Sequence, residues 1–184
     1  MTNAAGKVIV GANGTVYVAP VGTAAPTTAA AALNVAFKEL GYLTENGVTV
    51  TPSQGQTPIM AWQTAYKIRT LVTERGLVLD FVLREFNVQS LPFAFGGGAL
   101  AFAGGEYKYT PPTPEQTDPR ALVLDFLDGV KKYRLYVPNG QVEDLSGFSV
   151  SRSAPAELPV KFSLNYSGSG DPWNIFTTDL GIGS

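Results

Sequence analysis

The stretch YKIRTLVTERGLVLDFVLREF, residues 66–86, carries the strongest fold signal in the chain. Apolar and polar side chains alternate along it, which is the period of a β-strand. In its second half one face is wholly apolar and consists of Leu77, Leu79, Phe81 and Leu83. Asp80 and Arg84 lie on the opposite face. We interpret the stretch as two strands that meet at Arg75-Gly76 and form an antiparallel hairpin with one buried face.

Shorter alternating runs predict further strands on both sides of this stretch. They cover residues 14–20, 47–53, 99–111, 145–153 and 158–168. A hairpin is predicted around Asp128-Gly129, within residues 120–138, because Asp-Gly favours the tight turn between two strands. Asn46-Gly47 gives a similar turn signal just before Val48 and Val50. One short helix is predicted within residues 87–95, where Asn87 resembles an N-cap.

These signals predict a mainly β fold of two packed antiparallel sheets, a β-sandwich or barrel, with one short flanking α-helix. The 184 residues suffice for one well-cored domain, and we expect a single domain. Four segments are expected to be extended loops or arms: an N-terminal arm (about 1–13), a small-residue segment (about 21–36), a loop (about 52–64) and a C-terminal tail (about 168–184). The alanines of the small-residue segment could form a helical turn, but the flanking residues favour a loop.

The composition excludes several kinds of active site. The chain has no cysteine and no histidine, so thiolate nucleophiles, Ser-His-Asp triads and thiolate metal sites are ruled out. A net charge of -2 argues against a strongly basic nucleic-acid binder. The N-terminus lacks the pattern of a secretory signal, and no apolar run is long enough to span a bilayer. We therefore expect no enzyme, no cofactor, no metal and no membrane association.

Three features invite a chemical reading, and each has a simpler one. GGGALAFAGG, residues 96–105, lacks the phosphate-loop spacing and fits a glycine hinge or bulge better. The acidic residues could supply a catalytic carboxylate pair, but solvated strand faces and turns account for them. Basic residues near tyrosines could stack single-stranded nucleic acid, although an ordinary strand explains them better. These last residues are Lys108, Lys131, Lys132, Arg134, Tyr107, Tyr109, Tyr133 and Tyr136.

The order of several phrases resembles the major tail tube proteins of long-tailed, siphovirus-type bacteriophages, particularly those that infect actinobacteria. The phrases are GTVYVAP, FKELGYLTENGVTV, the segment around Trp62, ALVLDFLDGVKKYRLYVPNGQV and LNYSGSGDPWNIF. The resemblance runs from about residue 6 to the C-terminus. It rests on the order of these phrases and not on a catalytic motif.

The resemblance implies a tail-tube fold whose subunits form hexameric rings, and these rings stack into a hollow tube. By the same resemblance, the partners are the tape-measure protein inside the tube and tail-terminator and tail-tip proteins at its ends. DNA would pass through the lumen without specific binding, and the protein would be made in the host cytoplasm and reside in the virion tail. Acidic strand residues such as Asp80 and Asp125 are candidate lumen charges, because fixed positive charge would retain phosphates.

Assembly would also provide a role for exposed strand edges and exposed aromatic residues. Long strands leave edges that invite aggregation unless neighbouring subunits pair with them. The candidate subunit contacts are Tyr42, Leu43, Trp62, Trp173 and Phe176. For the two tryptophans, capping of the subunit's own core is an equally good interpretation. For the phrase around Tyr42, a plain loop-to-strand connection is the alternative.

Other functions remain compatible with the sequence. A ligand-binding β-sandwich, such as a carbohydrate-binding or capsid-decoration module, would expose Tyr107, Tyr109 or Trp173 as a platform. The inner tube of a contractile tail or injection system would share fold and assembly. An enzyme that uses only carboxylates would depend on residues such as Asp80 or Asp125.

Overall fold

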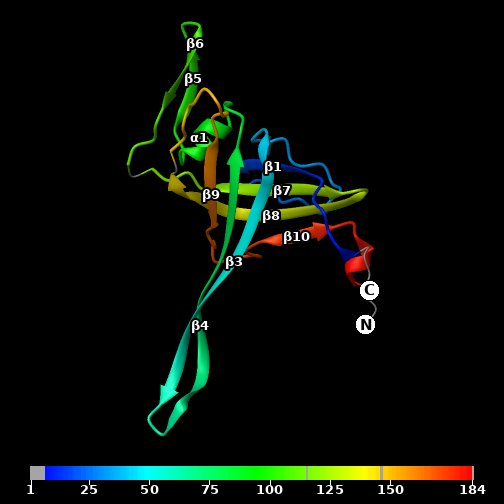
Figure 1. Cartoon of the computed structure of the whole chain (residues 1–184), viewed down its shortest axis with the longest axis vertical. Coiled ribbons are helices and arrows are strands. Elements are labelled where there is room, and N and C mark those ends of the chain that lie inside the picture. The colour runs from blue at the N-terminus through cyan, green and yellow to red at the C-terminus, as the bar shows by residue number, and fades with distance from the viewer. Residues whose placement is uncertain (1–6, 115, 146, 184) are drawn as a thin grey trace.

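A single large antiparallel sheet organises the chain, and a two-stranded sheet and a short helix accompany it (Figure 1). The computed structural model describes residues 7–114, 116–145 and 147–183. The strands are β1 (Asn13–Pro20), β2 (Lys38–Glu39), β3 (Leu43–Ala61), β4 (Thr64–Leu83), β5 (Ala99–Ala103), β6 (Glu106–Thr110), β7 (Arg120–Asp128), β8 (Lys131–Leu145), β9 (Leu158–Leu164) and β10 (Asn174–Thr177). The helix α1 spans Ser90–Ala94, and a 3-10 helix spans Leu180–Gly183.

The large sheet turns a corner at β8. Its strand order is β2-β1-β7-β8-β9-β4-β3, and β10 pairs with β8 off this path. The first half of β8 pairs with β7 and its second half with β9, and Gly140 is opposite Arg120 on one side and Leu164 on the other. A side chain at Gly140 would overlap the ring of Phe162. The corner therefore requires glycine, and it sends β9, β4 and β3 across the direction of β7 and β8 (Figure 1).

The two parts of the sheet enclose the main core. Leu77, Leu79, Phe81 and Leu83 of β4 lie in one buried cluster with residues of β1, β7, β8 and β9. Helix α1 closes one end of this core, where the ring of Phe93 stacks on that of Phe162 with centroids 5.8 Å apart. The predicted fold class is thus confirmed: the protein is mainly β, with packed antiparallel layers and one short helix. The two layers are parts of one hydrogen-bonded sheet.

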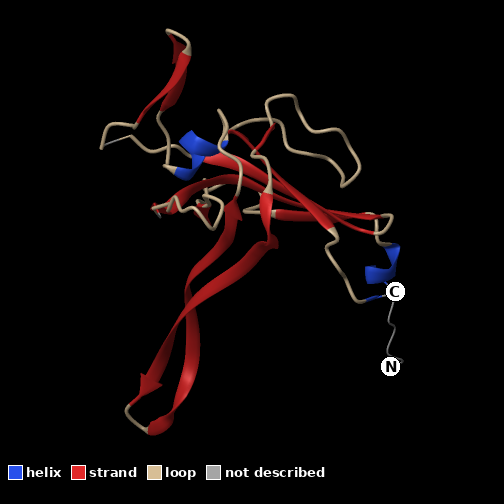
Figure 2. Ribbon diagram, turned by 45° about the horizontal axis from the view of Figure 1, so that its top comes forward, coloured by secondary structure: helices blue, strands red, loops and turns tan. Residues whose placement is uncertain are grey.

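The region that opened the sequence analysis differs from the prediction. β4 runs without interruption through Arg75-Gly76, and its partner is β3, so the hairpin turns at Trp62-Gln63 (Figure 2). The predicted turn at Arg75-Gly76 and the predicted loop at 52–64 are therefore wrong. One reason is that Gly76 keeps a negative φ and pairs with Ser53. The other is that the backbone groups of the polar residues in β3 form hydrogen bonds with β4, so these residues can belong to a strand without being buried.

The phrase FKELGYLTENGVTV also folds differently in detail. β3 begins at Leu43, and the register shifts between the pairs Leu43–Leu83 and Val48–Phe81. Gly47, with φ of 67°, lies inside this β-bulge. Asn46-Gly47 is therefore not a turn that precedes the strand. The bulge forms because both halves of β3 still pair with β4 while the residues between them are extra.

Five further segments complete the comparison with the predictions. Residues 99–111 form two strands, β5 and β6, because Gly104 and Gly105 both adopt positive φ and turn the chain. Residues 147–153 are not a strand, and the prediction there is wrong; their side chains are exposed, so no core face selects an extended pairing. The C-terminal tail contains β10 and the 3-10 helix, whereas residues 21–36 form neither strand nor α-helix. Residues 1–6 of the expected N-terminal arm lie outside the described residues.

Candidate subunit interface

The outer part of the β3–β4 hairpin, residues 51–76, projects from the sheet; we call it the distal arm (Figure 2). Almost all of its side chains are exposed, and many are large and apolar. Trp62 at the turn is 100% exposed, Tyr66 is 83% exposed and Ile68 is 61% exposed. Ile59, Met60, Leu71 and Val72 are exposed as well. So many exposed large apolar side chains on one hairpin indicate an interaction site rather than a free surface.

The tip of the distal arm combines this apolar surface with positive charge. In the β3–β4 ladder Lys67 is opposite Met60 and Arg69 is opposite Ile59. Directly opposed residues project to the same face of a sheet, so each cation lies beside an apolar side chain. Within the described part of the chain, neither Lys67 nor Arg69 is in a salt bridge.

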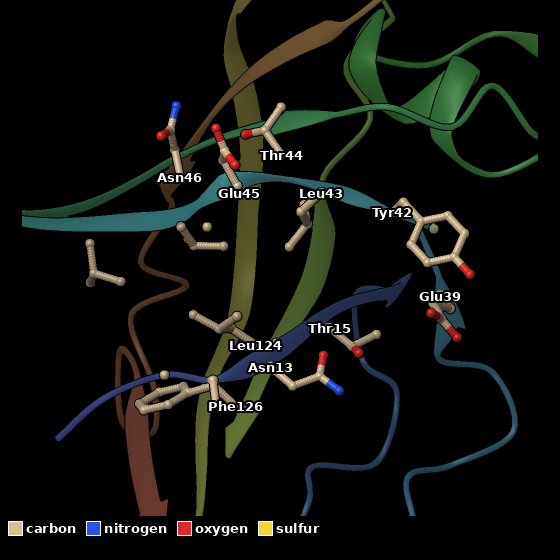
Figure 3. A pocket seen from close by; sticks show the side chains of 17 residues that line it. Asn13, Thr15, Glu39, Tyr42, Leu43, Thr44, Glu45, Asn46, Leu124 and Phe126 are labelled. Carbon is tan, nitrogen blue, oxygen red and sulfur yellow. The ribbon is translucent and has the colours of Figure 1, made fainter. Parts of the chain in front are cut away.

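A second surface lies where β1 and the start of β3 face each other; we call it the β1–β3 groove (Figure 3). Its volume is about 790 Å³. Leu43, Val48, Leu124 and Phe126 supply apolar side chains to it, and all four also pack against or belong to the main core. Glu39 and Tyr42 lie together at one end of the groove, whereas the Glu45 side chain projects from the β3 bulge on the side away from β1.

The backbone at Gly41 sets the direction of Tyr42. Gly41 has φ of 95°, and a side chain there would overlap Glu85. The Glu85 carboxylate instead accepts a hydrogen bond from the Tyr42 backbone N–H at 3.2 Å. Only glycine fits this turn. As a result Tyr42 is 79% exposed, while Leu43 faces inward and is half-buried.

The small-residue segment is fixed to the sheet by Arg134. Its guanidinium donates hydrogen bonds to both carboxylate oxygens of Asp125, at 2.6 and 2.7 Å. It also donates to the backbone carbonyls of Thr28 and Ala31, at 2.9 and 2.8 Å. Arg134 is buried, and its planar fork satisfies all four acceptors at once. Residues 28–31 are therefore held against β7 and β8.

The two candidate contacts near the C-terminus have different surroundings. Trp173 is partly exposed and lines a hollow at the base of the distal arm together with Tyr166 and Arg75. Phe176 of β10 packs against a small buried cluster that includes Val123 and Tyr136. Trp62, by contrast, does not cap the core at all.

Asp179 fastens the end of this segment to β8. Its carboxylate accepts hydrogen bonds from the Lys131 ammonium at 2.9 Å and the Tyr133 hydroxyl at 2.8 Å. These bonds, that of Lys131 first, lower the pKa of Asp179. The same environment raises the pKa of Tyr133, mainly through desolvation.

The candidate lumen charges are in different environments. Asp80 is exposed on the face of β4 that points away from the core, next to Thr49 and Lys161 on the neighbouring strands. Asp125 is paired with Arg134, so its negative charge is compensated within the subunit. The sequence analysis did not find this pair, although the Asp128-Gly129 turn places residue 125 opposite residue 134.

The aromatic and basic residues do not form one surface. Tyr133, Arg134 and Tyr136 are buried, and the hydroxyl of Tyr109 donates to the Gly97 carbonyl at 2.8 Å. Tyr107 is exposed near the tip of the β5–β6 hairpin, where it contacts Phe102. Among the described residues, no helix has the length and apolar character needed to cross a membrane.

Comparison with known proteins identifies the family. No curated protein matches the chain. A family model described as "Phage tail tube protein" matches residues 1–182, which is nearly the whole chain. Members of this family are structural subunits of the tail tube, so the match implies self-assembly into a tube and a place in the virion tail. The chain belongs to the phage tail tube protein family.

Proposed function

We propose that this tail tube subunit forms hexameric rings that stack into the hollow tube of a long, non-contractile tail, through which DNA passes to the host. The observation that carries the proposal is the distal arm, whose exposed apolar residues would be an aggregation hazard on a monomer. Burial between copies removes that hazard. The family match supports the tube. The hexameric ring, the siphovirus-type tail and the passage of DNA are further parts of the proposal.

The free edges of the sheet support lateral assembly. β3 ends the strand order, so one side of this 19-residue strand has no partner within the large sheet. Pairing between neighbours in a ring would remove such an edge. Pro52 and Pro58 lie on β3 and have no backbone N–H to donate to a neighbouring strand. Pairing with another copy is therefore expected between these two prolines and at the positions nearer the core. Trp173 and Phe176 remain candidate contacts of the same assembly.

Negative-stain electron microscopy of the purified protein tests the proposal directly. We expect rings or tubes with sixfold symmetry for the natural chain. A shortened variant, in which residues 55–74 are replaced by Asn-Gly, should keep its β-sheet circular dichroism and form no tubes. A natural chain that stays monomeric at all concentrations would contradict the proposal, and so would tubes of unchanged length from the shortened variant.

For the lumen, we propose that exposed acidic side chains such as Asp80 repel the phosphates of passing DNA. Asp125 contributes less to this effect, because Arg134 compensates its charge. Phage that carry Asp80→Lys together with Asp144→Lys on the adjacent exposed face should eject DNA more slowly from tails of normal appearance. Ejection at the natural rate would argue against an acidic lumen at this face. The tape-measure, tail-terminator and tail-tip proteins are the further partners that this function requires.

One observation favours a second candidate, a ligand-binding module. Phe102 and Tyr107 are both exposed on the β5–β6 hairpin, with ring centroids 4.9 Å apart. Tyr109 does not join them, because its ring packs on Phe95. A glycan array or a capsid-pelleting assay with the natural chain and with Tyr107→Ser tests this candidate. A contractile tail tube shares the fold, and a neighbouring sheath gene would identify it.

A further inference from the structure

The chain contains three Asn-Gly steps, and the fold places them in different surroundings. They are Asn13-Gly14 in β1, Asn46-Gly47 in β3 and Asn139-Gly140 in β8. Asparagine is a thermolabile residue, because the backbone nitrogen of the next residue can attack its side-chain amide. Glycine in that next position leaves this nitrogen accessible, since glycine has no Cβ. All three steps therefore carry the same local chemistry, and the fold distinguishes them.

The reaction at such a step is an internal cyclisation followed by hydrolysis. The backbone nitrogen of the glycine forms a bond to the side-chain Cγ of the asparagine, and the bond from Cγ to the amide nitrogen breaks. The proton of the backbone nitrogen leaves with the amide group as ammonia, and the product is a cyclic succinimide. Water then opens the ring at either carbonyl and gives aspartate or isoaspartate. Ring closure requires Cγ to approach the backbone nitrogen, whereas an extended backbone, with ψ of about +135°, holds the two atoms apart.

Two of the three steps are held in paired, extended backbone. Asn13 and Gly14 are both paired with residues of β7. Gly140 is buried and pairs with β7 on one side and with β9 on the other. The carbonyl of Asn139 accepts a hydrogen bond from the backbone N–H of Asn165 at 2.9 Å. A succinimide can form at either step only after the ladder has opened locally.

Asn46-Gly47 is the step without this restraint. It lies in the bulge of β3, and residues 44–47 have no paired residue in the described β3–β4 ladder. The Asn46 side chain is exposed. A Cβ at Gly47 would meet nothing within 4 Å, whereas at Gly140 it would overlap the ring of Phe162. The bulge therefore has both the backbone freedom and the space that ring closure needs.

We propose that Asn46 is a site of spontaneous modification, at which the folded subunit converts to aspartate or isoaspartate while Asn13 and Asn139 keep their amides. Isoaspartate lengthens the backbone by one carbon. The bulge accepts this extra atom, because it already interrupts the ladder and has no register to keep. The modified subunit consequently stays folded.

The modification changes the charge of a surface that the proposed function uses. Asn46 lines a hollow together with Asp80, Asp144 and Lys161. Each conversion adds a carboxylate to this hollow, so the net charge of the subunit becomes more negative than its initial -2. The consequence for DNA in the lumen rests on the proposed function, whereas the modification itself requires only the folded subunit.

Peptide mapping of the natural chain in two states tests the proposal. Folded protein and protein unfolded in guanidinium chloride are incubated side by side at mildly alkaline pH. Trypsin then places the three steps in separate peptides, residues 8–38, 39–67 and 135–152. Tandem mass spectrometry measures the conversion of amide to acid at each step, and a sample digested before incubation gives the background.

The two states separate the effect of the fold from that of the sequence step. In the folded protein we expect conversion at Asn46 to be at least about tenfold faster than at Asn13 or Asn139, because the backbone at those two must open first. In the unfolded protein we expect the three rates to agree within about threefold, because little local structure remains to distinguish them. Folded-state rates that are equal at the three steps, or slowest at Asn46, would overturn the proposal.

Asn46→Gln is the matched variant, because it keeps an amide whose longer side chain would have to close a larger ring. On isoelectric focusing the incubated natural chain should gain an acidic form, and the variant should stay at its starting position. The natural chain should keep its β-sheet circular dichroism as the acidic form accumulates. An acidic form of the variant would assign the modification to another residue and contradict the proposal. None of these measurements requires tubes, so a failure of the proposed assembly would leave them unaffected.

Discussion

The inner and outer parts of the β3–β4 hairpin are made from the same two strands and have opposite environments. In the inner part Leu77, Leu79, Phe81 and Leu83 are buried, and in the outer part Ile68, Leu71 and Val72 are exposed. Both parts alternate and both are paired across the hairpin, with register shifts between Leu43 and Val48 in the inner part and between Gly55 and Ala61 in the outer part. The strand pattern therefore sets the hairpin, whereas burial depends on which other elements cross it. The outer part has no such element in its own chain among the described residues, and the proposed partner is another copy.

The largest expected effect comes from truncating the same residue type at two places on β4. Leu79→Ala removes a fully buried side chain and should lower the free energy of unfolding by about 2–5 kcal/mol. Leu71 is 48% exposed, so Leu71→Ala should change stability by less than about 0.5 kcal/mol. Chemical denaturation followed by circular dichroism measures both. Equal losses at the two positions would show that the distal arm is already buried in the isolated subunit.

A smaller effect is expected where a charged side chain, and not an apolar face, holds a segment to the sheet. Arg134→Ala leaves Asp125 and two loop carbonyls without their partner and should cost about 2–3 kcal/mol, less than a fully buried pair because Asp125 is partly exposed. Hydrogen exchange should also rise in residues 28–31. Arg120→Ala is the control: it removes a more exposed pair with Asp118, at a cost of about 0–1 kcal/mol. Unchanged exchange in residues 28–31 would mean that Arg134 does not fix the segment.

The smallest effect is expected at the C-terminal segment and appears in acid. The pKa of Asp179 is lowered from 3.8 by its bonds to Lys131 and Tyr133. A carboxylate with a lowered folded-state pKa stabilises the fold above its ordinary pKa, and this contribution is lost as the pH falls through the lowered value. In a Trp62→Phe background the fluorescence of Trp173, which precedes β10, should report detachment of the segment below about pH 4. Asp179→Asn should shift the fluorescence toward that of the detached state already at neutral pH and remove the acid transition. A transition that persists in this variant would assign it to another group.

Sequence reasoning was successful where one local signal is sufficient. The apolar face of residues 77–83 predicted burial correctly, and Asp128-Gly129 predicted the β7–β8 hairpin. The register of that hairpin already places Asp125 opposite Arg134, so the ion pair was within reach of the sequence. Helix α1 was predicted as well, but its N-cap residue is Gln89 and not Asn87. The Asn87 side chain lies just before it and accepts hydrogen bonds from the backbone N–H groups of Gln89 and Ser90, at 2.8 Å each.

Prediction failed where glycine and polar residues can serve two structures. Gly76 and residues 52–64 were interpreted as a turn and a loop, because polar, proline-containing stretches usually leave a sheet. In the fold Gly76 and residues 52–61 continue a strand, since each is paired with a residue on the other strand of the hairpin, and Trp62-Gln63 form the turn. Gly47 was interpreted as part of a turn and lies in a bulge. Local sequence does not specify the partner strand, and the partner decides between these outcomes.

The sequence by itself determined that this protein is mainly β, where its central apolar face lies, and that its cysteine- and histidine-free chemistry excludes many kinds of active site. The family match over residues 1–182 agrees with a structural role in the tail tube. Only the tertiary structure decided that half of the longest hairpin leaves the core, that Arg134 holds residues 28–31, and that Glu39 and Tyr42 border one groove. The physical reason is that side-chain alternation is a local property, whereas burial and charge pairing depend on elements far apart in the chain.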